Sequence, residues 1–154
     1  MLDNITIRNA KLSDAVKISE LIEKHAKNEK MLAMPSELII ERIRDYFVAV
    51  KDSNIIGCCA VAFFSEKLAE IRSLAVANEY MNMGIGKRLI GKAEQILKEE
   101  GIEYAFALTV NPDFFIKMGY EKSDKDKYPL KIWKDCVKCP KIMKCDEIAV
   151  EKRL

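Results

Sequence analysis

A loop with two glycines joins an apolar strand to an amphipathic helix in the middle of this chain. The pattern predicts the strand over residues 69–76 and the helix over 84–100, with Gly84 and Gly86 at the helix start. The first turn of a helix has backbone N–H groups without intrahelical partners and carries the positive end of the helix dipole. Glycines keep side chains away from those groups. The segment therefore predicts a strand–helix unit whose helix start can receive a phosphate group.

Other glycine-rich phosphate motifs fit this segment less well. A P-loop ends in Ser or Thr, and Ala93 stands in that place here. A dinucleotide fingerprint has a third glycine, and Leu89 stands in its place. The alternative is a purely structural role, in which the glycines only form the turn at the helix cap. The strand before the loop and the amphipathic helix after it favour phosphate binding.

Length and composition bound the class of protein. A chain of 154 residues is expected to form one domain over 1–154, with a core over about 5–133 and a cysteine-containing C-terminal tail over 134–154. No apolar run approaches the ~20 residues that span a bilayer. The first residues have no hydrophobic signal region, so we expect a cytoplasmic protein without a membrane partner. A net charge of +2 gives no broad footprint for nucleic acid.

Apolar periodicity predicts alternating strands and helices. The strands are expected at 4–8, 47–50, 55–64, 69–76, 104–109, 120–122 and 130–133, and the helices at 13–28, from 35 onward, at 84–100 and at 113–118. With the last two strand-like segments, 120–122 and 130–133, counted together, the order is β-α-α-β-β-β-α-β-α-β. The strand–helix–strand segment from 69 to 108 is expected to be a right-handed parallel crossover, which places the chain in the α/β class.

This order, together with the phrase Leu74-Ala75-Val76 and the glycine loop, resembles the GNAT superfamily of acetyltransferases. The motif of that superfamily reads R/Q-x-x-G-x-G/A, and Met81 stands where Arg or Gln is usual. The resemblance implies a GNAT fold, with a mixed central sheet, splayed fourth and fifth strands, and helices on both faces.

The resemblance also implies acetyl-CoA as co-substrate. The loop would hold the pyrophosphate, and the backbone of residues 74–76 would pair with the pantetheine arm. One N–H there, that of Leu74, would polarise the thioester carbonyl. The residues implied in cofactor binding are Leu74, Ala75, Val76, Asn82, Met83, Gly84, Ile85, Gly86, Lys87, Asn111 and Phe115.

Two charged residues on the strand over 69–76 are candidates for the chemistry. Glu70 lies at the spacing before the loop where histone-type members of the superfamily place their catalytic glutamate, and it would act as general base. Strand alternation puts Arg72 on the same face, where a guanidinium suits a substrate carboxylate. The structural alternatives are a surface Glu70 paired with Lys67 or Arg72, and an Arg72 that serves only this ion pair.

The segment L-T-V-N-P-D-F-F over 108–115, followed by 128–136, resembles N-acetylglutamate synthase-type amino-acid acetyltransferases. Phe115 stands where many members carry the tyrosine that protonates the leaving thiolate, and Tyr120 is expected in the core. The resemblance implies acetyl transfer to the α-amine of glutamate or a similar small amino acid, as in arginine biosynthesis. Transfer to a protein N-terminus, a lysine or a polyamine, and a non-catalytic acyl-CoA-binding module, are the alternatives. A homodimer is also possible for a chain of this kind.

The cysteines fall into two groups. Cys58 and Cys59 lie in an apolar strand and are expected in the core. Cys136, Cys139 and Cys145 resemble a metal knuckle, but a structural zinc site needs a fourth ligand, so metal binding, a redox-sensitive tail and a merely structural tail stay open. His25 is expected to be a surface histidine with its hydrogen bonds satisfied. A catalytic role is not expected, because no Ser or Cys lies at a spacing where His25 could activate it as a nucleophile.

Overall fold

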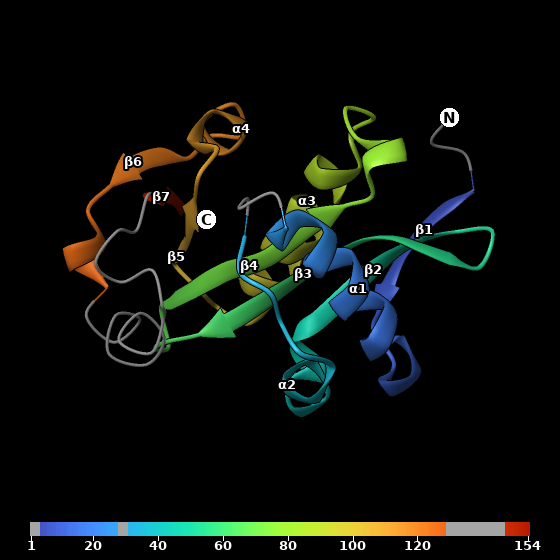
Figure 1. The fold of residues 1–154 in the computed structure, drawn as a ribbon. Coiled ribbons are helices and arrows are strands. Elements are labelled where there is room, and N and C mark those ends of the chain that lie inside the picture. Colours follow the sequence, from blue (N-terminus) through green and yellow to red (C-terminus); the bar gives the residue numbers. More distant parts are fainter. Residues whose placement is uncertain (1–3, 28–30, 129–146) are drawn as a thin grey trace. The chain divides into compact units, whose positions relative to one another are not determined.

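The computed structural model describes residues 4–27, 31–128 and 147–154 (Figure 1). The strands are β1 (Ile5–Asn9), β2 (Tyr46–Lys51), β3 (Asn54–Phe63), β4 (Leu68–Val76), β5 (Tyr104–Thr109), β6 (Glu121–Ser123) and β7 (Ile148–Arg153). The helices are α1 (Ala15–Ala26), α2 (Ser36–Glu41), α3 (Ile85–Glu99) and α4 (Pro112–Ile116). The order predicted from the sequence is confirmed through β6. The strand expected at 130–133 lies outside the described residues.

The chain divides into two compact units, and β4 contributes to both. The first unit comprises residues 1–62 and 71–96, and the second comprises 63–70 and 97–154. Hydrogen-bonded strands follow the order β1-β2-β3-β4 in the first unit and β4-β5-β7-β6 in the second.

The strands of the first unit begin with an antiparallel meander. β1 pairs with β2 from Ile5↔Lys51 to Asn9↔Phe47, and β2 pairs with β3 across a tight turn. Asp52 and Ser53 of that turn have φ of 50° and 66°, which is the backbone that a two-residue hairpin with right-handed strand twist requires. The strands predicted at 47–50 and 55–64 are therefore neighbours in a hairpin.

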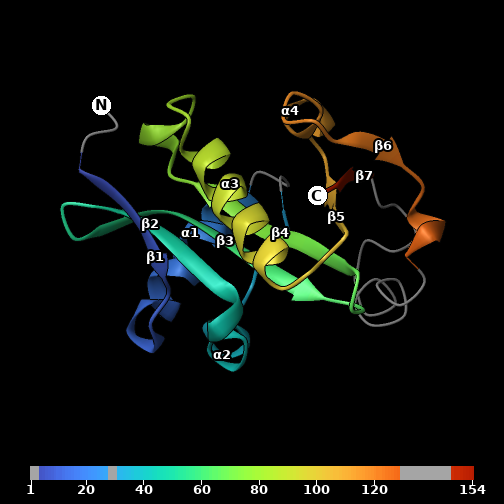
Figure 2. The same ribbon diagram turned by 180° about the vertical axis from the view of Figure 1, so that it is seen from behind.

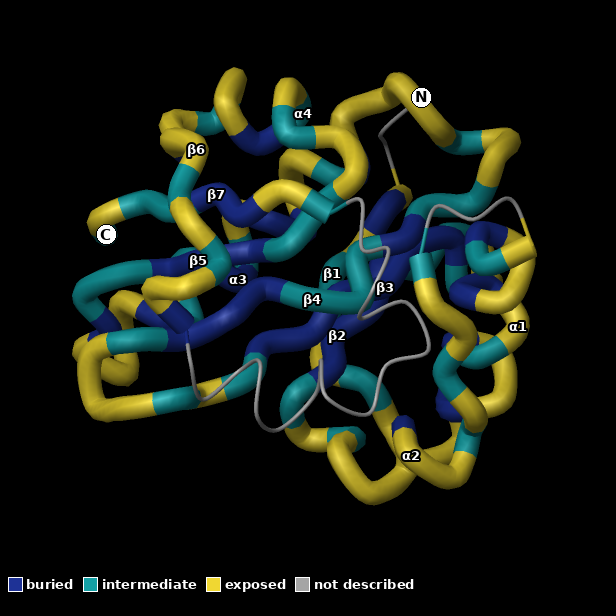
Figure 3. Tube along the Cα trace, turned by 60° about the vertical axis from the view of Figure 1, so that its left-hand side comes forward, coloured by how far each residue is buried: buried dark blue, intermediate teal, exposed yellow. Residues whose placement is uncertain are grey.

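Helices cover both faces of the first unit's strands, as expected. α1 lies in front of them in Figure 1 and α3 in Figure 2. A buried cluster lies between α1, α2 and one face, and it includes Ile18, Ile22, Ile39, Val48 and Cys58. The longest buried stretches lie in β2 and β3, and the helices expose their outer sides (Figure 3). Burial of the apolar stripes of the helices against the sheet gives this layered arrangement.

A glycine allows α3 to approach the opposite face closely. A Cβ placed on Gly57 of β3 would lie 3.0 Å from Leu89 Cδ1 and 3.4 Å from the Ala75 carbonyl oxygen. Gly57 and its neighbour but one, Cys59, face α3, whereas Cys58 faces α1 and α2. The two adjacent cysteines, both fully buried as predicted, therefore lie on opposite faces of one strand.

The second unit confirms the predicted parallel pair. Leu68 to Glu70 of β4 align with Tyr104 to Phe106 of β5 in a parallel ladder. The ladder ends there, although β4 continues to Val76. The sheet therefore contains both parallel and antiparallel pairs. The short ladder between β4 and β5 agrees with the expected splay of the fourth and fifth strands.

Strand β7 was not predicted from the sequence. It runs antiparallel to both β5 and β6 and lies between them, so it occupies an interior position in the second unit. Ala149 and Val150 are buried, but the strand also carries Glu151, Lys152 and Arg153. So few apolar residues give a weak strand pattern, and only the neighbours on both sides establish the strand.

Candidate functional site

The carboxyl-terminal half of β4 belongs to the first unit and is held by contacts on its backbone. The Val76 carbonyl accepts a hydrogen bond from His25 Nε2 at 2.8 Å, and the Ala77 N–H donates to the Ile56 carbonyl of β3 at 2.8 Å. Ala75 is buried, while Leu74 and Val76 are half-buried. The end of the strand is therefore fixed by α1 and by β3.

His25 is buried, with 7% of its surface exposed, so the expectation of a surface histidine was wrong. The reason is its position on α1, seven residues after Ile18 and three after Ile22, which puts it on the buried stripe of that helix. That spacing was visible in the sequence. Its contact with the Val76 carbonyl was not, because the two residues are 51 positions apart.

Two residues of the glycine loop have a left-handed backbone. Asn82 and Gly84 have φ of 64° and 84°, and α3 begins at Ile85. Ile85 and Leu89 are buried under the sheet, while the segment from Met81 to Gly84 is exposed. Burial of Ile85 and Leu89 anchors the first turn of α3, next to the exposed loop. Such a helix start, with the exposed Lys87 beside it, can bind an anion.

Glu70 is buried, with 3% of its surface exposed. It is the last residue of β4 in the ladder with β5, where it aligns with Phe106. The alternative of a solvent-exposed surface glutamate therefore does not describe this residue. A carboxylate on a buried strand is the kind of group that can serve as a general base.

Arg72 lies two residues further along β4, in the first unit, and is half-buried. The positive charges of Arg72 and Arg42 interact electrostatically with the carboxyl group of Asp45, the last residue of the short 3₁₀ turn Ile43–Asp45. Burial raises the pKa of the Asp45 carboxyl, and the two positive charges oppose that rise. Arg72 thus shares a charged cluster with Asp45 and Arg42, which the sequence did not predict.

The residue after Arg72 has an unusual backbone. Ser73 has φ of 56°, in the left-handed region that non-glycine residues rarely occupy inside a strand. Its hydroxyl lies 3.4 Å from the Tyr46 hydroxyl, and its carbonyl accepts a hydrogen bond from the Cys58 thiol at 3.3 Å. No sequence signal marks Ser73, because Gly and Asn are the residue types associated with this backbone.

Asn111 and Phe115 lie in the second unit. Asn111 is exposed and precedes Pro112, the first residue of α4, and its N–H donates to Thr109 Oγ1 at 2.9 Å. Phe115 is 5% exposed and packs edge-on against Tyr120, at 5.2 Å between ring centroids. Tyr120 is buried, which confirms its expected place in the core. The role of Asn111 and Phe115 toward a cofactor stays a prediction.

Within residues 4–27, 31–128 and 147–154, no group of three or more His, Cys, Asp or Glu side chains is placed to hold a metal ion. Cys136, Cys139 and Cys145 lie outside these residues, so their metal binding stays a prediction. In the same described part of the chain, every helix is too short or too polar to cross a bilayer.

Comparison with known proteins gives a consistent result. Residues 15–120 match the acetyltransferase (GNAT) family. An uncharacterized N-acetyltransferase of Chlorobaculum tepidum is 53% identical over 148 residues, which cover 96% of each chain. The amino-acid acetyltransferase of Neisseria meningitidis is 29% identical over 127 residues, which are 81% of this chain and 29% of that protein.

Solved structures show the same likeness. N-acetylglutamate synthase from Neisseria gonorrhoeae, complexed with coenzyme A and N-acetyl-glutamate, superposes with a TM-score of 0.88 at 25% identity over 97% of this chain. This chain covers 35% of that synthase. A Mycobacterium tuberculosis protein in complex with CoA has a TM-score of 0.82 at 22% identity and shares the fold over 97% of this chain and 99% of its own.

Proposed function

Because the chain belongs to the acetyltransferase (GNAT) family, we propose that it transfers the acetyl group of acetyl-CoA to the α-amine of glutamate or a similar small amino acid. The observation that carries the proposal is the pair of charged residues on β4, the buried Glu70 and, two residues later, Arg72. The coenzyme A and N-acetyl-glutamate of the gonococcal synthase support the same class of reaction. The chain spans about a third of that synthase, so the acceptor is part of the proposal.

In this proposal the glycine loop would hold the pyrophosphate of coenzyme A. The loop is exposed and contains positive φ at Asn82 and Gly84, directly before α3, a helix of 15 residues. The backbone N–H groups of the first helical turn would donate to the phosphate oxygens, and Lys87 adds a positive charge. Bound acetyl-CoA supplies the thioester that carries the acetyl group.

The chain's own groups would perform three tasks in the reaction. Glu70 would accept a proton from the acceptor ammonium, directly or through one water, because only the neutral amine attacks a thioester. The Leu74 N–H would donate a hydrogen bond to the thioester oxygen as negative charge develops on it. Arg72 would hold a carboxylate of the acceptor in a two-pronged ion pair, in exchange for its interaction with Asp45.

The leaving thiolate does not need a dedicated proton donor. A free thiol has a pKa of about 8.5, so a thiolate is an acceptable leaving group near neutral pH. The phenylalanine at position 115, where many members of the family carry a tyrosine, is therefore compatible with turnover.

The test is a measurement of acetyl-CoA consumption with a panel of acceptors: the free amino acids, the amides of the acidic ones, lysine-containing peptides and polyamines. We expect turnover with a free acidic amino acid and little with its α-amide. A preference for peptides or polyamines over every free amino acid would refute the amino-acid acceptor and leave the acetyltransferase. Binding of CoA without turnover on any amine would indicate a non-catalytic acyl-CoA-binding module.

A further inference from the structure

We infer that Cys58 and Tyr46 are positioning residues that hold the left-handed backbone of Ser73 and so aim the Leu74 N–H. The inference rests on the proposed function, in which that N–H donates to the thioester oxygen. All the residues involved lie in the first unit, on strands β2, β3 and β4.

Ser73 has a left-handed backbone inside strand β4. A φ of 56° in a non-glycine residue is costly, because the Cβ crowds the neighbouring peptide group. Such a conformation persists only where its surroundings impose it, and it is common where a site needs an unusual backbone direction. At Ser73 it interrupts the regular alternation of β4, one residue before Leu74. The direction of the next peptide group therefore depends on it.

Cys58 contacts the backbone on both sides of Leu74. Its thiol donates to the Ser73 carbonyl at 3.3 Å, and it also has a hydrogen bond with the Ala75 backbone. The side chain is fully buried, and burial raises the pKa of this thiol to about 12. The thiol therefore keeps its proton, and its capacity to donate, throughout the physiological pH range. The Cys58 sulfur therefore contacts the backbone of the residues immediately before and after Leu74, whose N–H the proposed reaction would use.

Tyr46 holds the side chain of Ser73. The two hydroxyl oxygens are 3.4 Å apart, and Tyr46 is 3% exposed at the start of β2. Its ring is part of the cluster between the sheet, α1 and α2, so the hydroxyl cannot move without disturbing that cluster. Ser73 is therefore held by its carbonyl from β3 and by its hydroxyl from β2.

The neighbouring cysteine gives a matched control. Cys59 is also fully buried in β3, but its thiol is directed to the Ala60 carbonyl at 3.8 Å, and it lies on the other face of the strand. Cys58→Ala and Cys59→Ala remove the same atoms from the same strand. Only the first removes a contact with the backbone beside Leu74.

The experiment measures kcat with the best amine, the Kd of CoA, and the melting temperature for both alanine variants, Cys58→Ser and Tyr46→Phe. We expect Cys58→Ala to lower kcat by about tenfold or more, because a small displacement of the Leu74 N–H would weaken its hydrogen bond to the thioester oxygen. The Kd of CoA should change less than about threefold, because the loop at α3 is untouched. Cys58→Ser, which keeps a donor, should recover part of the loss, and Tyr46→Phe should lower kcat more weakly. Equal kcat values in Cys58→Ala and Cys59→Ala would overturn the inference.

A second measurement separates this inference from the proposed function. Amide hydrogen exchange at Leu74 and Ala75 reports the backbone directly and needs no substrate. We expect faster exchange at both amides in Cys58→Ala than in Cys59→Ala. If the wild type acetylates no amine, the proposed function fails and the exchange rates alone decide whether Cys58 holds this backbone. Unchanged exchange in Cys58→Ala would overturn the inference whatever the activity.

Discussion

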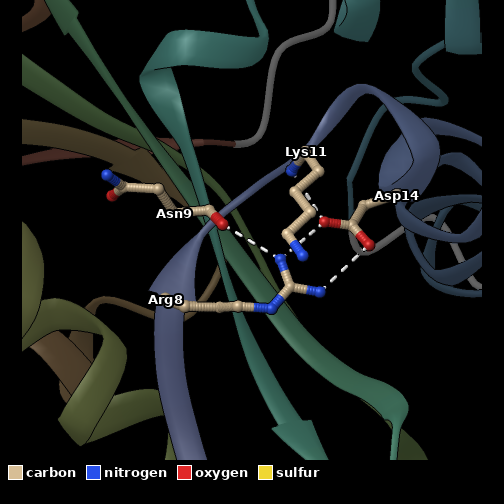
Figure 4. Close-up of polar contacts among 4 residues, drawn as sticks. All are labelled: Arg8, Asn9, Lys11 and Asp14. Carbon is tan, nitrogen blue, oxygen red and sulfur yellow. Dashed lines mark hydrogen bonds and ion pairs between the residues drawn. The ribbon is translucent and has the colours of Figure 1, made fainter.

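Asp14 receives two hydrogen bonds from the guanidinium of Arg8, at 2.7 Å from Nη1 and 3.2 Å from Nη2 (Figure 4). The Lys11 backbone N–H also donates to this carboxylate, at 2.7 Å. The contacts join β1 to the turn that precedes α1. The hydrogen bonds with Arg8 lower the pKa of Asp14, although burial opposes the shift.

This ion pair predicts a pH-dependent stability. The unfolded carboxyl has a pKa of about 3.9, so the stabilisation is present above that value and is lost as the pH falls through the lower folded pKa. Asp14→Asn should reduce the free energy of unfolding at pH 7 by about 1–2 kcal/mol, a modest figure because Arg8 is 33% exposed. Urea unfolding at pH 7, 5 and 3 should show the difference shrinking at acid pH. Glu20→Gln, exposed on α1, is the control, and a pH-independent difference would contradict the prediction.

The second prediction concerns the glycine loop. Gly84→Val should abolish tight CoA binding, because the side chain would cover the first-turn N–H groups and would not tolerate φ of 84°. Gly101→Val is the matched control: this glycine also has positive φ, 81°, and follows α3 at its other end. Both variants should lose similar stability in thermal unfolding. Calorimetry should find the loss of CoA binding only in Gly84→Val, and equal CoA affinities would refute the pyrophosphate site.

Glu70→Gln tests the general base. The change preserves size but removes the proton acceptor, so kcat should fall by about 10²–10⁴ at neutral pH. The deficit should narrow at high pH, where more of the amine arrives deprotonated. A full pH–rate profile is the measurement. Glu66→Gln, in the exposed turn before β4, should behave like the wild type. Wild-type turnover in Glu70→Gln near pH 7 would show that Glu70 is structural.

Arg72 should determine the KM of the acceptor. Arg72→Ala should raise the KM for the amino acid much more than that for acetyl-CoA, because only the acceptor loses an ionic partner. Arg72→Lys should rescue poorly, since an ammonium cannot make the two-pronged contact. Steady-state kinetics with both substrates varied would test this, with the exposed Arg44→Ala as control. An equal rise in both KM values would instead indicate a general disturbance around Asp45.

Two glycines should respond to alanine with opposite signs. Gly91 lies within α3 with no atom within 4 Å of an added Cβ, so Gly91→Ala should stabilise the protein by about 1 kcal/mol through helix propensity. Gly57→Ala should destabilise it, because the new methyl would lie 3.0 Å from Leu89 Cδ1. Chemical unfolding of both variants measures the difference. Stabilisation by Gly57→Ala would contradict the close approach of α3 to β3.

The amino-acid sequence by itself determined the local elements and the loop at α3. The bounds of β5 were predicted residue for residue, because Tyr104 to Thr109 form an apolar run between clear breaks. The start of α3 was predicted because glycine, apolar spacing and helix periodicity are all local properties. The turn at Asp52 and Ser53 is likewise formed by residues adjacent in the sequence.

Only the tertiary structure decided what depends on contacts distant in the sequence. Ser73, which has a left-handed backbone, contacts Tyr46 and Cys58, and these residues lie 27 and 15 positions away in the sequence. The burial of Glu70 depends on a partner strand beyond α3, and β7 is recognisable only between β5 and β6. Local propensity carries no information about such partners, because the stabilising contact and the residue that needs it come together only when the chain folds.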